Sequence, residues 1–265
     1  MSGYNMIDEM KRTVAEIRKR KPLILCLTNY VTMDFMANSL LALGAAPVMS
    51  EAEEEIAELS ALSQVVYINL GTVNEVFAKR AHYAVEQAKI SKKPIVLDPV
   101  GAGASHLRTS TALSLVSKVD VVRGNASEIM SLSGLGATTR GVETAEHVSS
   151  AMSSARIIAE RYKNIVAISG AEDFITDLNQ EHRLNYGSSL MPLITGMGCT
   201  LTAVISAFIS CSESYYQGTV HALTYFSLCG QYVAQNISKP GTFRQHFIDA
   251  LYEPNWDFFS ETLEI

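Results

Sequence analysis

The stretch PIVLDPVGAGAS, residues 94–105, joins a short apolar run to a loop that is rich in glycine. Within the run, Ile95, Val96 and Leu97 follow one another without the polar alternation that marks a half-exposed strand. Four runs of the same kind recur along the chain: LILCLT (23–28), VVYINL (65–70), VDVV (119–122) and NIVAIS (164–169). Strands of this composition are buried on both faces, so the runs predict a mostly parallel sheet between two layers of helices.

Segments with helical periodicity lie between these runs. The first has Asn5 as its expected N-cap, followed by apolar residues at helical spacing: Met6, Met10, Val14 and Ile17. A second helix is expected at 33–43, where Gly44 closes it. Further helices are expected at 74–91, 107–117 and 144–163.

The last third of the chain departs from this alternation. DFITD (173–177) and HRLNY (182–186) predict an antiparallel hairpin with its turn at Asn179, and from Gly198 the pattern is helical almost to the end. No linker, repeat or low-complexity segment interrupts the order of elements. The sequence therefore predicts an α/β protein, a three-layer α/β/α sandwich, as one domain over residues 1–265.

Composition limits the classes of function. The chain has 265 residues, of which 48% are hydrophobic and 18% charged, enough to bury a substantial core. Its net charge of −6 argues against nucleic acid or an anionic membrane surface as the main partner. No run approaches the roughly 20 apolar residues of a membrane-spanning helix. The four cysteines (Cys26, Cys199, Cys211 and Cys229) lie far apart, without the spacing of a zinc site or a disulfide framework. We expect a soluble, cytoplasmic protein.

The segments that follow the strands point to a ligand cleft. Each is polar or rich in glycine: TN (28–29), NLGT (69–72), DPVGAGAS (98–105), RGNASE (123–128) and SGAED (169–173). In an open parallel sheet these junctions emerge together at the carboxyl edge, where ligands bind. Later in the chain, Gly196 and Gly198 flank Met197 just before a helical run. Glycines permit a tight turn, and the N–H groups at a helix start face negative charge, so this stretch predicts an anion cradle.

Charged residues at these junctions have two interpretations each. Asp98 precedes Pro99 and is a natural turn residue, while Asn125 and Glu128 have the spacing of an N-cap and its capping-box partner. Alternatively, Asp98 and Glu128 converge on a hydrated Mg²⁺, which favours few carboxylates together with water and substrate phosphates. Arg123 ends a buried strand and needs an anion there, either a nearby carboxylate or a nucleotide phosphate.

Six motifs follow one another between about residue 20 and the PGTF at 240–243: LTNYVTMDFMAN, ALGAAPVMSEAEEE, INLGT, LDPVGAGAS, RGNASEI and GMGC. Together they resemble the hydroxyethylthiazole kinase family of the ribokinase-like superfamily. The resemblance implies a ribokinase-like fold with no separate lid domain. It also implies ATP- and Mg²⁺-dependent phosphorylation of 4-methyl-5-(2-hydroxyethyl)thiazole in thiamine salvage, by a homotrimer whose active sites lie between subunits.

The resemblance also implies roles for residues on the substrate side of the cleft. Met49 packs against the thiazole with Asn29 near it, and Gly198 lies beside the substrate. Cys199 stands where relatives in the superfamily use a catalytic Asp. At a helix start near Mg²⁺ its pKa is expected below the ordinary thiol value, which makes it a weak proton acceptor. The other interpretation is that Cys199 only fills space at a tight turn.

On the nucleotide side, the resemblance implies that Arg123 and Ser169 contact ATP, and we assign Asn125 and Gly196 to the same ligand. Two positions depart from the family pattern. Ser169 stands where Thr is usual and keeps the hydroxyl group. Met197 replaces a small residue and is expected to narrow the cradle.

Other functions remain open at this stage. A kinase for another vitamin-precursor alcohol, such as a hydroxymethylpyrimidine, and a nucleotide-dependent dehydratase both suit the fold, and a non-catalytic binding module is the third alternative. The apolar segment 28–50 predicts an exposed patch for subunit contact, formed by Met33, Phe35, Met36, Val48 and Met49.

Overall fold

The computed structural model of the protein describes residues 3–134 and 145–263. In this part of the chain eight strands form one sheet, in the order β2-β1-β3-β4-β5-β6-β7-β8. Strands β1 to β6 run parallel, and β7 and β8 are antiparallel additions at one edge. The strands are β1 (Leu23–Leu27), β2 (Ala46–Met49), β3 (Val65–Asn69), β4 (Ile95–Asp98), β5 (Val121–Gly124), β6 (Ile165–Ile168), β7 (Asp173–Thr176) and β8 (Glu181–Leu184).

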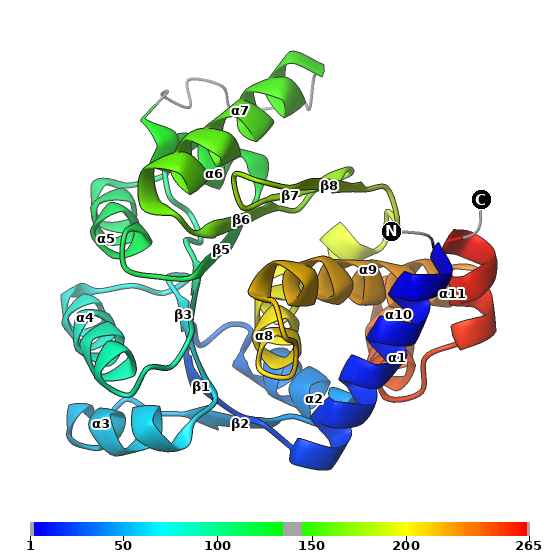
Figure 1. The fold of residues 1–265 in the computed structure, drawn as a ribbon, viewed down its shortest axis with the longest axis horizontal. Helices are drawn as coiled ribbons and strands as arrows, with labels where there is room; N and C mark the ends of the chain where they lie inside the picture. Colours follow the sequence, from blue (N-terminus) through cyan, green and yellow to red (C-terminus); the bar gives the residue numbers. More distant parts are fainter. Residues whose placement is uncertain (1–2, 135–144, 264–265) are drawn as a thin grey trace.

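Helices cover both faces of the sheet (Figure 1). One layer contains α3 (Glu53–Leu62), α4 (Glu75–Ile90), α5 (His106–Val116), α6 (Ala126–Ser133) and α7 (Ala145–Tyr162). The other contains α1 (Gly3–Arg20), α2 (Met33–Leu43), α8 (Met197–Ile209), α9 (Tyr215–Ala234), α10 (Pro240–Tyr252) and α11 (Trp256–Leu263), with a short 3₁₀ helix at Met191–Leu193. Successive residues of each strand feed opposite layers. In β1, for example, Ile24 packs with the α8 layer and Leu25 with the α4 layer. The predicted α/β/α sandwich is confirmed.

Local signals placed most elements correctly. The hairpin of β7 and β8 lies where it was predicted, and the region after Gly198 is helical almost to its end. Gly44 ends α2 in the left-handed conformation, with φ of 108°. The acidic run EAEEE opens α3, where Glu53, Glu54 and Glu55 are exposed near the positive end of the helix dipole.

Two boundaries and one strand differ from the expectation. Helix α1 begins at Gly3, so Asn5 lies inside the helix and is not its N-cap. Strand β5 covers Val121–Gly124 rather than 119–122, and Arg123 therefore lies within the strand. Strand β2 was not expected, because four half-buried residues that include Pro47 carry little strand pattern; proline is tolerated at this edge of the sheet.

The order of strands creates a crevice at the carboxyl edge. After β1 the chain places β2 on one side, and then returns to place β3 on the other. At such a reversal the loops that leave the two strands diverge, and ligands bind between them. Asn29 follows β1, Asn69 ends β3, and α8 packs against both strands. The topology thus brings the two asparagines and the start of α8 to one place.

The predicted apolar patch in segment 28–50 is wrong in part. Phe35 and Met36 are 1% and 0% exposed because they form the buried face of α2. The large apolar residues of this segment that are strongly exposed are Tyr30, Val31 and Leu41, at 59%, 68% and 59%. Val48 and Met49 are half-buried at the sheet edge.

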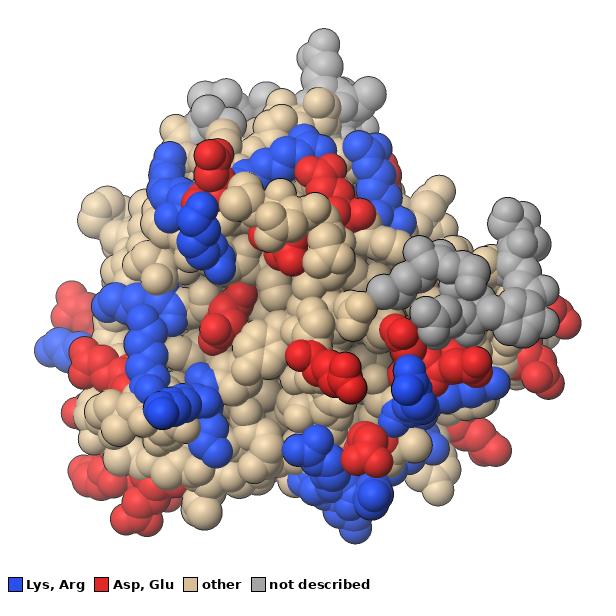
Figure 2. Space-filling model, viewed as in Figure 1, with Lys and Arg blue, Asp and Glu red and all other residues tan. Residues whose placement is uncertain are grey.

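Basic and acidic side chains both occur around the face shown in Figure 2, with a broad uncharged area between them. A basic group lies over the end of α1, whose last turn contains Arg18, Lys19 and Arg20. Cations there offset the negative end of the helix dipole. None of the helices in the described ranges is both long and apolar enough to cross a membrane.

A buried histidine makes the stability of the fold dependent on pH. His221 of α9 is 3% exposed, and its Nε2 lies 3.3 Å from Glu9 Oε2 of α1. Burial, with smaller contributions from the charges of His182 and Arg12, lowers the pKa of His221 to about 4. The folded state therefore keeps His221 neutral at pH 5, whereas the unfolded chain takes up the proton below about pH 6.5.

We therefore predict that the wild type loses more stability on acidification than the variant His221→Gln. Between pH 7.5 and 5.0 the difference in unfolding free energy between the two should change by about 1–2 kcal/mol in favour of the variant. Urea unfolding at both pH values measures it. An equal decrease in unfolding free energy on acidification of both proteins would contradict the prediction.

Candidate active site

The first turn of α8 forms the floor of the site, and both of its glycines lie close to side chains from other parts of the chain. Gly196 is the N-cap and adopts φ of 90°, a conformation that favours glycine; an added Cβ would come within 2.8 Å of the Thr32 side chain. At Gly198 an added Cβ would lie 2.6 Å from Nη1 of Arg123. The helix start, where N–H groups lack partners within the helix, is therefore approached directly by a guanidinium.

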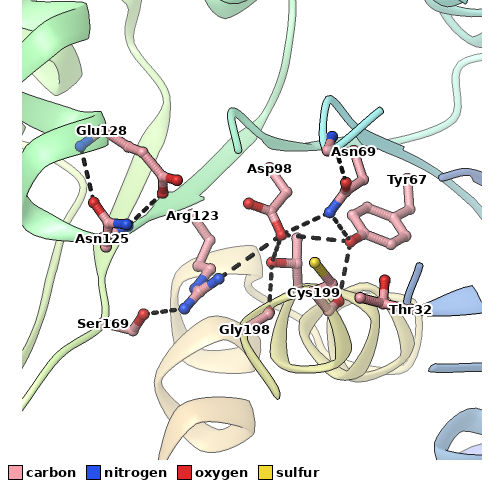
Figure 3. Close-up of polar contacts among 12 residues, drawn as sticks. Thr32, Tyr67, Asn69, Asp98, Arg123, Asn125, Glu128, Ser169, Gly198 and Cys199 are labelled. Atoms are coloured by element: carbon pink, nitrogen blue, oxygen red, sulfur yellow. Dashed lines mark hydrogen bonds and ion pairs between the residues drawn. The ribbon is translucent and has the colours of Figure 1, made fainter. Parts of the chain in front are cut away.

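Arg123 crosses this helix start from β5 (Figure 3). Its Nη2 donates to Ser169 Oγ after β6, and its Nη1 lies 3.7 Å from Asp98 Oδ2. The residue is only 8% exposed, and its Nε finds no acceptor in the described part of the chain. Arg123 thus has a carboxylate nearby, beyond hydrogen-bond distance, and keeps donor capacity for a further anion.

Asp98, at the end of β4, is a fully buried carboxylate that accepts hydrogen bonds from two other elements. Its Oδ2 accepts hydrogen bonds from Thr202 Oγ1 at 2.8 Å and from Asn69 Nδ2 at 3.0 Å, and Tyr67 Oη lies 3.4 Å away. Its Oδ1 is buried and finds no donor among the described residues. Burial raises the pKa of Asp98 to about 6, although the charge of Arg123 opposes the shift. The carboxylate is therefore more than a turn residue.

Asn125 and Glu128 form the capping box of α6. Asn125 Oδ1 accepts the N–H of Glu128 at 2.9 Å, and Glu128 Oε2 accepts the N–H of Asn125 at 2.8 Å. Glu128 Oε1 also accepts the N–H of Gly101 at 2.9 Å, which ties the loop after β4 to this helix. The prediction that Asn125 is a helix N-cap and Glu128 its capping-box partner is confirmed. The negative charge of Glu128 still acts on Asp98, whose pKa it raises.

Cys199 lies in the first turn of α8, and the prediction that its pKa is lowered is wrong for this arrangement. Its Sγ accepts a hydrogen bond from Asn29 Nδ2 at 3.4 Å, and its carbonyl oxygen accepts one from the hydroxyl group of Tyr67 at 3.0 Å. Burial first, and then the nearby charge of Asp98, raise the pKa of the thiol. These two effects outweigh the helix terminus, so the thiol is protonated at neutral pH.

Asn29 organises the loop after β1. Its Oδ1 accepts the N–H groups of Val31 and Thr32 and the hydroxyl of Thr32, at 3.0–3.1 Å. Its Nδ2 donates to Asn69 Oδ1 at 2.8 Å. Met49 lies at the end of the neighbouring strand β2, level with Cys26 of β1. The predicted substrate residues thus share one end of the crevice, and the amide of Asn29 is already bonded within the protein.

A cavity of about 720 Å³ opens on the other side of Arg123. Its lining includes Arg123, Asn125, Ser169, Met197 and Gly198 from the predicted set. It continues between the segment at 185–192 and α9. The side chain of Met197 is 7% exposed and also packs into the core. The predicted residues therefore divide into a cavity group and a group around Cys199, with Arg123 and Gly198 between them.

Several residues of the site escaped the sequence interpretation. Arg108 donates to the carbonyl oxygens of Leu70, Gly71 and Val100 at 2.8–2.9 Å, so it fixes the loops after β3 and β4. Tyr67 and Thr202 are fully buried beneath Asp98. An apolar strand and an apolar helix give no local sign that one hydroxyl in each meets a carboxylate. Asn69 belongs to the polar NLGT junction, but the sequence predicted no role for it.

Comparison with known proteins agrees with this geometry. A protein from Chlamydia felis named hydroxyethylthiazole kinase is 42% identical over 254 residues, which are 95% of this chain and 97% of that protein. Another of that name, from Aliivibrio salmonicida, is 40% identical over 248 residues, 93% of each chain. Both relatives match almost end to end.

Solved structures give the same picture. The hydroxyethylthiazole kinase protein of Pyrococcus horikoshii OT3 has a TM-score of 0.86 and 35% identity, covering 96% of this chain and 95% of that one. The pyridoxal kinase from Staphylococcus aureus, in complex with pyridoxal, has a TM-score of 0.62 and 19% identity, with 79% and 88% coverage, which shows a shared fold alone. Because residues 14–255 match the family itself, the chain belongs to the hydroxyethylthiazole kinase family.

Proposed function

We propose that this protein transfers the γ-phosphoryl group of ATP to the hydroxyl group of 4-methyl-5-(2-hydroxyethyl)thiazole, in the cytoplasm, as a step of thiamine salvage. One observation carries the proposal: Arg123 and the start of α8 lie between a large cavity and the group of side chains around Cys199. Such an arrangement places two ligands on either side of an anion cradle. The names of the relatives supply the identities of the ligands.

ATP occupies the cavity in this proposal. Arg123 and Ser169 contact its phosphates, with Asn125 beside them, and the N–H groups at the start of α8 (residues 196–199) face the group being transferred. Phosphoryl transfer has a loose transition state, so positioning and neutralisation of charge supply most of the catalysis. A guanidinium and a helix N-terminus at the same point meet that requirement.

The donor set fits Mg²⁺. Asp98 Oδ1 is a buried carboxylate oxygen without a donor among the residues that the structure describes, and Glu128 adds a second negative charge close to it. Mg²⁺ needs only one or two carboxylates when water and phosphates complete its shell. Asp98 and Glu128 would hold the ion, which neutralises charge on the phosphates. The bonds that Glu128 makes to two backbone N–H groups keep its carboxylate in place for this task.

The thiazole lies on the opposite side, against Met49 and near Asn29, with its hydroxyl group toward Cys199 and Gly198. A protonated thiol is a poor base, and Asn29 fixes its position by a hydrogen bond. Because the transition state is loose, the hydroxyl group needs little assistance in losing its proton. Cys199 orients the hydroxyl group, and the proton is accepted by the small fraction of the enzyme in which the thiol is ionised.

The decisive experiment is mass spectrometry of the products after incubation with ATP, Mg²⁺ and the hydroxyethylthiazole. The proposal expects ADP and a thiazole that is heavier by one phosphoryl group. Phosphorylation of a hydroxymethylpyrimidine in its place indicates the other vitamin-precursor kinase. Release of phosphate without any phosphorylated alcohol indicates a dehydratase. No turnover at all indicates a binding module.

The active assembly is proposed to be a homotrimer with sites between subunits. Tyr30 and Val31 are strongly exposed beside the crevice, and β2 is an edge strand with half-buried Val48 and Met49. Association of copies would cover these side chains. Light scattering at micromolar concentration should give three times the mass of one chain, and Tyr30→Glu should lower it. A fully active monomer would contradict the trimer.

We predict that Arg123→Ala raises the KM for ATP far more than the KM for the thiazole. Loss of a charge-assisted contact costs about 1.5–3 kcal/mol, so the ATP value should rise roughly 10–100-fold. Steady-state kinetics with each substrate varied in turn measures both constants. Arg161→Ala, an exposed arginine outside the cavity, is the matched control. Unchanged dependence on ATP would leave Arg123 as a structural partner of Asp98.

Substitutions of Cys199 separate a weak base from a spacer. Cys199→Ser should stay active but lose on the order of 10²-fold in kcat, while Cys199→Asp should equal or exceed the wild type, because a carboxylate accepts a proton more readily at pH 7. With its raised pKa, the wild-type thiol should also give a kcat that increases from pH 6 to 9, more steeply than that of Cys199→Asp. An inactive Asp variant beside an unimpaired Ser variant would show that Cys199 only fills space.

A further inference from the structure

Asp173 is a buried carboxylate in the cavity for which no task has been assigned. It opens β7, is 5% exposed, and lines the cavity together with Arg123, Ser169 and Gly170. Burial raises its pKa to about 6, and the charge of Arg123 opposes this shift. A buried carboxylate is costly, so its position calls for a compensating role.

Both oxygens of this carboxylate are bonded to other elements. Oδ1 accepts the N–H of Gly170 at 3.0 Å, and Oδ2 accepts the hydroxyl of Ser227 at 3.3 Å. Gly170 belongs to the loop between β6 and β7, and Ser227 is a buried residue of α9. Asp173 therefore bridges a loop at the edge of the sheet and a helix of the covering layer.

The bridged loop holds the partner of Arg123. The N–H of Ser169 donates to the carbonyl oxygen of Gly124 at 3.0 Å, and the N–H of Gly170 is taken by Asp173. With both N–H groups bonded, the backbone at 169–170 has one arrangement, and Ser169 Oγ is presented to Arg123. The hydrogen bond from Gly170 to Asp173 fixes the part of this loop that is not hydrogen-bonded to β5.

Direct binding of phosphate by Asp173 is excluded by its charge, since a carboxylate repels an anion at close range. Its hydrogen bonds to Gly170 and Ser227 indicate instead that it positions the residues around it. We infer that Asp173 is a positioning residue for nucleotide binding: by bridging Gly170 and Ser227 it holds Ser169, and through it Arg123, in the arrangement that receives the phosphates. This inference rests on the proposed nucleotide occupant of the cavity.

Two substitutions at this position separate hydrogen bonding from charge. Asn is nearly isosteric with Asp: its Oδ1 can accept from Gly170, and its Nδ2 can donate to the oxygen of Ser227. Asp173→Asn therefore keeps the bridge and removes the charge, whereas Asp173→Ala removes both. Ser227→Ala removes one end of the bridge from the helix side. Glu172→Ala is the matched control, because Glu172 is the neighbouring acid but pairs with Arg183 at 3.5 Å outside the cavity lining.

The experiment measures calorimetric binding of a non-hydrolysable ATP analogue with Mg²⁺, together with kcat and the KM values for ATP and the thiazole. Asp173→Ala should weaken nucleotide binding and raise the ATP KM about tenfold, and Ser227→Ala about threefold, with kcat changed less than twofold. Asp173→Asn and Glu172→Ala should bind the nucleotide as the wild type does. Recovery by Asn is the result that a bridge of hydrogen bonds requires.

Three results would overturn the inference. Equal weakening by Asp173→Asn and Asp173→Ala would assign the effect to charge. A lower kcat or melting temperature with unchanged nucleotide affinity would assign Asp173 to stability alone. A wild type that binds no nucleotide would remove the occupant itself. A wild type that binds the analogue but phosphorylates no thiazole would instead refute the proposed function, while the binding measurements still decide on Asp173.

Discussion

The site depends on one buried carboxylate. Asp98 stands at the end of a central strand with no exposed surface, and its Oδ2 gathers hydrogen-bond donors from β3 and α8, with the guanidinium of Arg123 from β5 nearby. A charge in such a place is tolerated only when its neighbours compensate it. Each compensating group therefore has a fixed position, and the start of α8 is held against the sheet. Asp98 Oδ1 accepts no hydrogen bond from the described residues, so it remains able to bind a further donor or a cation.

A second constraint follows, because Arg123 must reach Asp98 and Ser169 across the start of α8. An added Cβ at Gly198 would lie 2.6 Å from Nη1 of Arg123, so the guanidinium would have to shift. In the proposed site the same glycine leaves the helix N-terminus open to an anion, so one small residue would serve both the cation and the anion cradle. The bridge from Ser227 through Asp173 to Gly170 holds the far end of this arrangement. The helical layer and the sheet are thus connected through polar contacts on both sides of the cavity.

Local chemistry explains why much of this was predictable. Apolar runs buried on both faces and polar junctions after them were sufficient for a parallel sheet with a site at its carboxyl edge, and N-terminal signals placed the capping box of Asn125 and Glu128. The errors have physical causes as well. Phe35 and Met36 were expected at the surface because hydrophobicity does not reveal which face of α2 is buried. The pKa of Cys199 was expected to fall because the helix terminus is visible in the sequence, whereas burial and Asp98 are not.

The sequence by itself determined the class of fold and the sheet edge at which the polar junctions gather, because these follow from composition and spacing within short segments. Its motifs also resemble the family to which the chain belongs. Only the tertiary structure decided how side chains far apart in the chain act on one another. Tyr67 and Thr202 share Asp98 although 135 positions separate them, Arg108 joins two loops, and Asp173 meets α9. Charge and burial act through space, and their balance at a residue is set by neighbours that the order of the chain does not reveal.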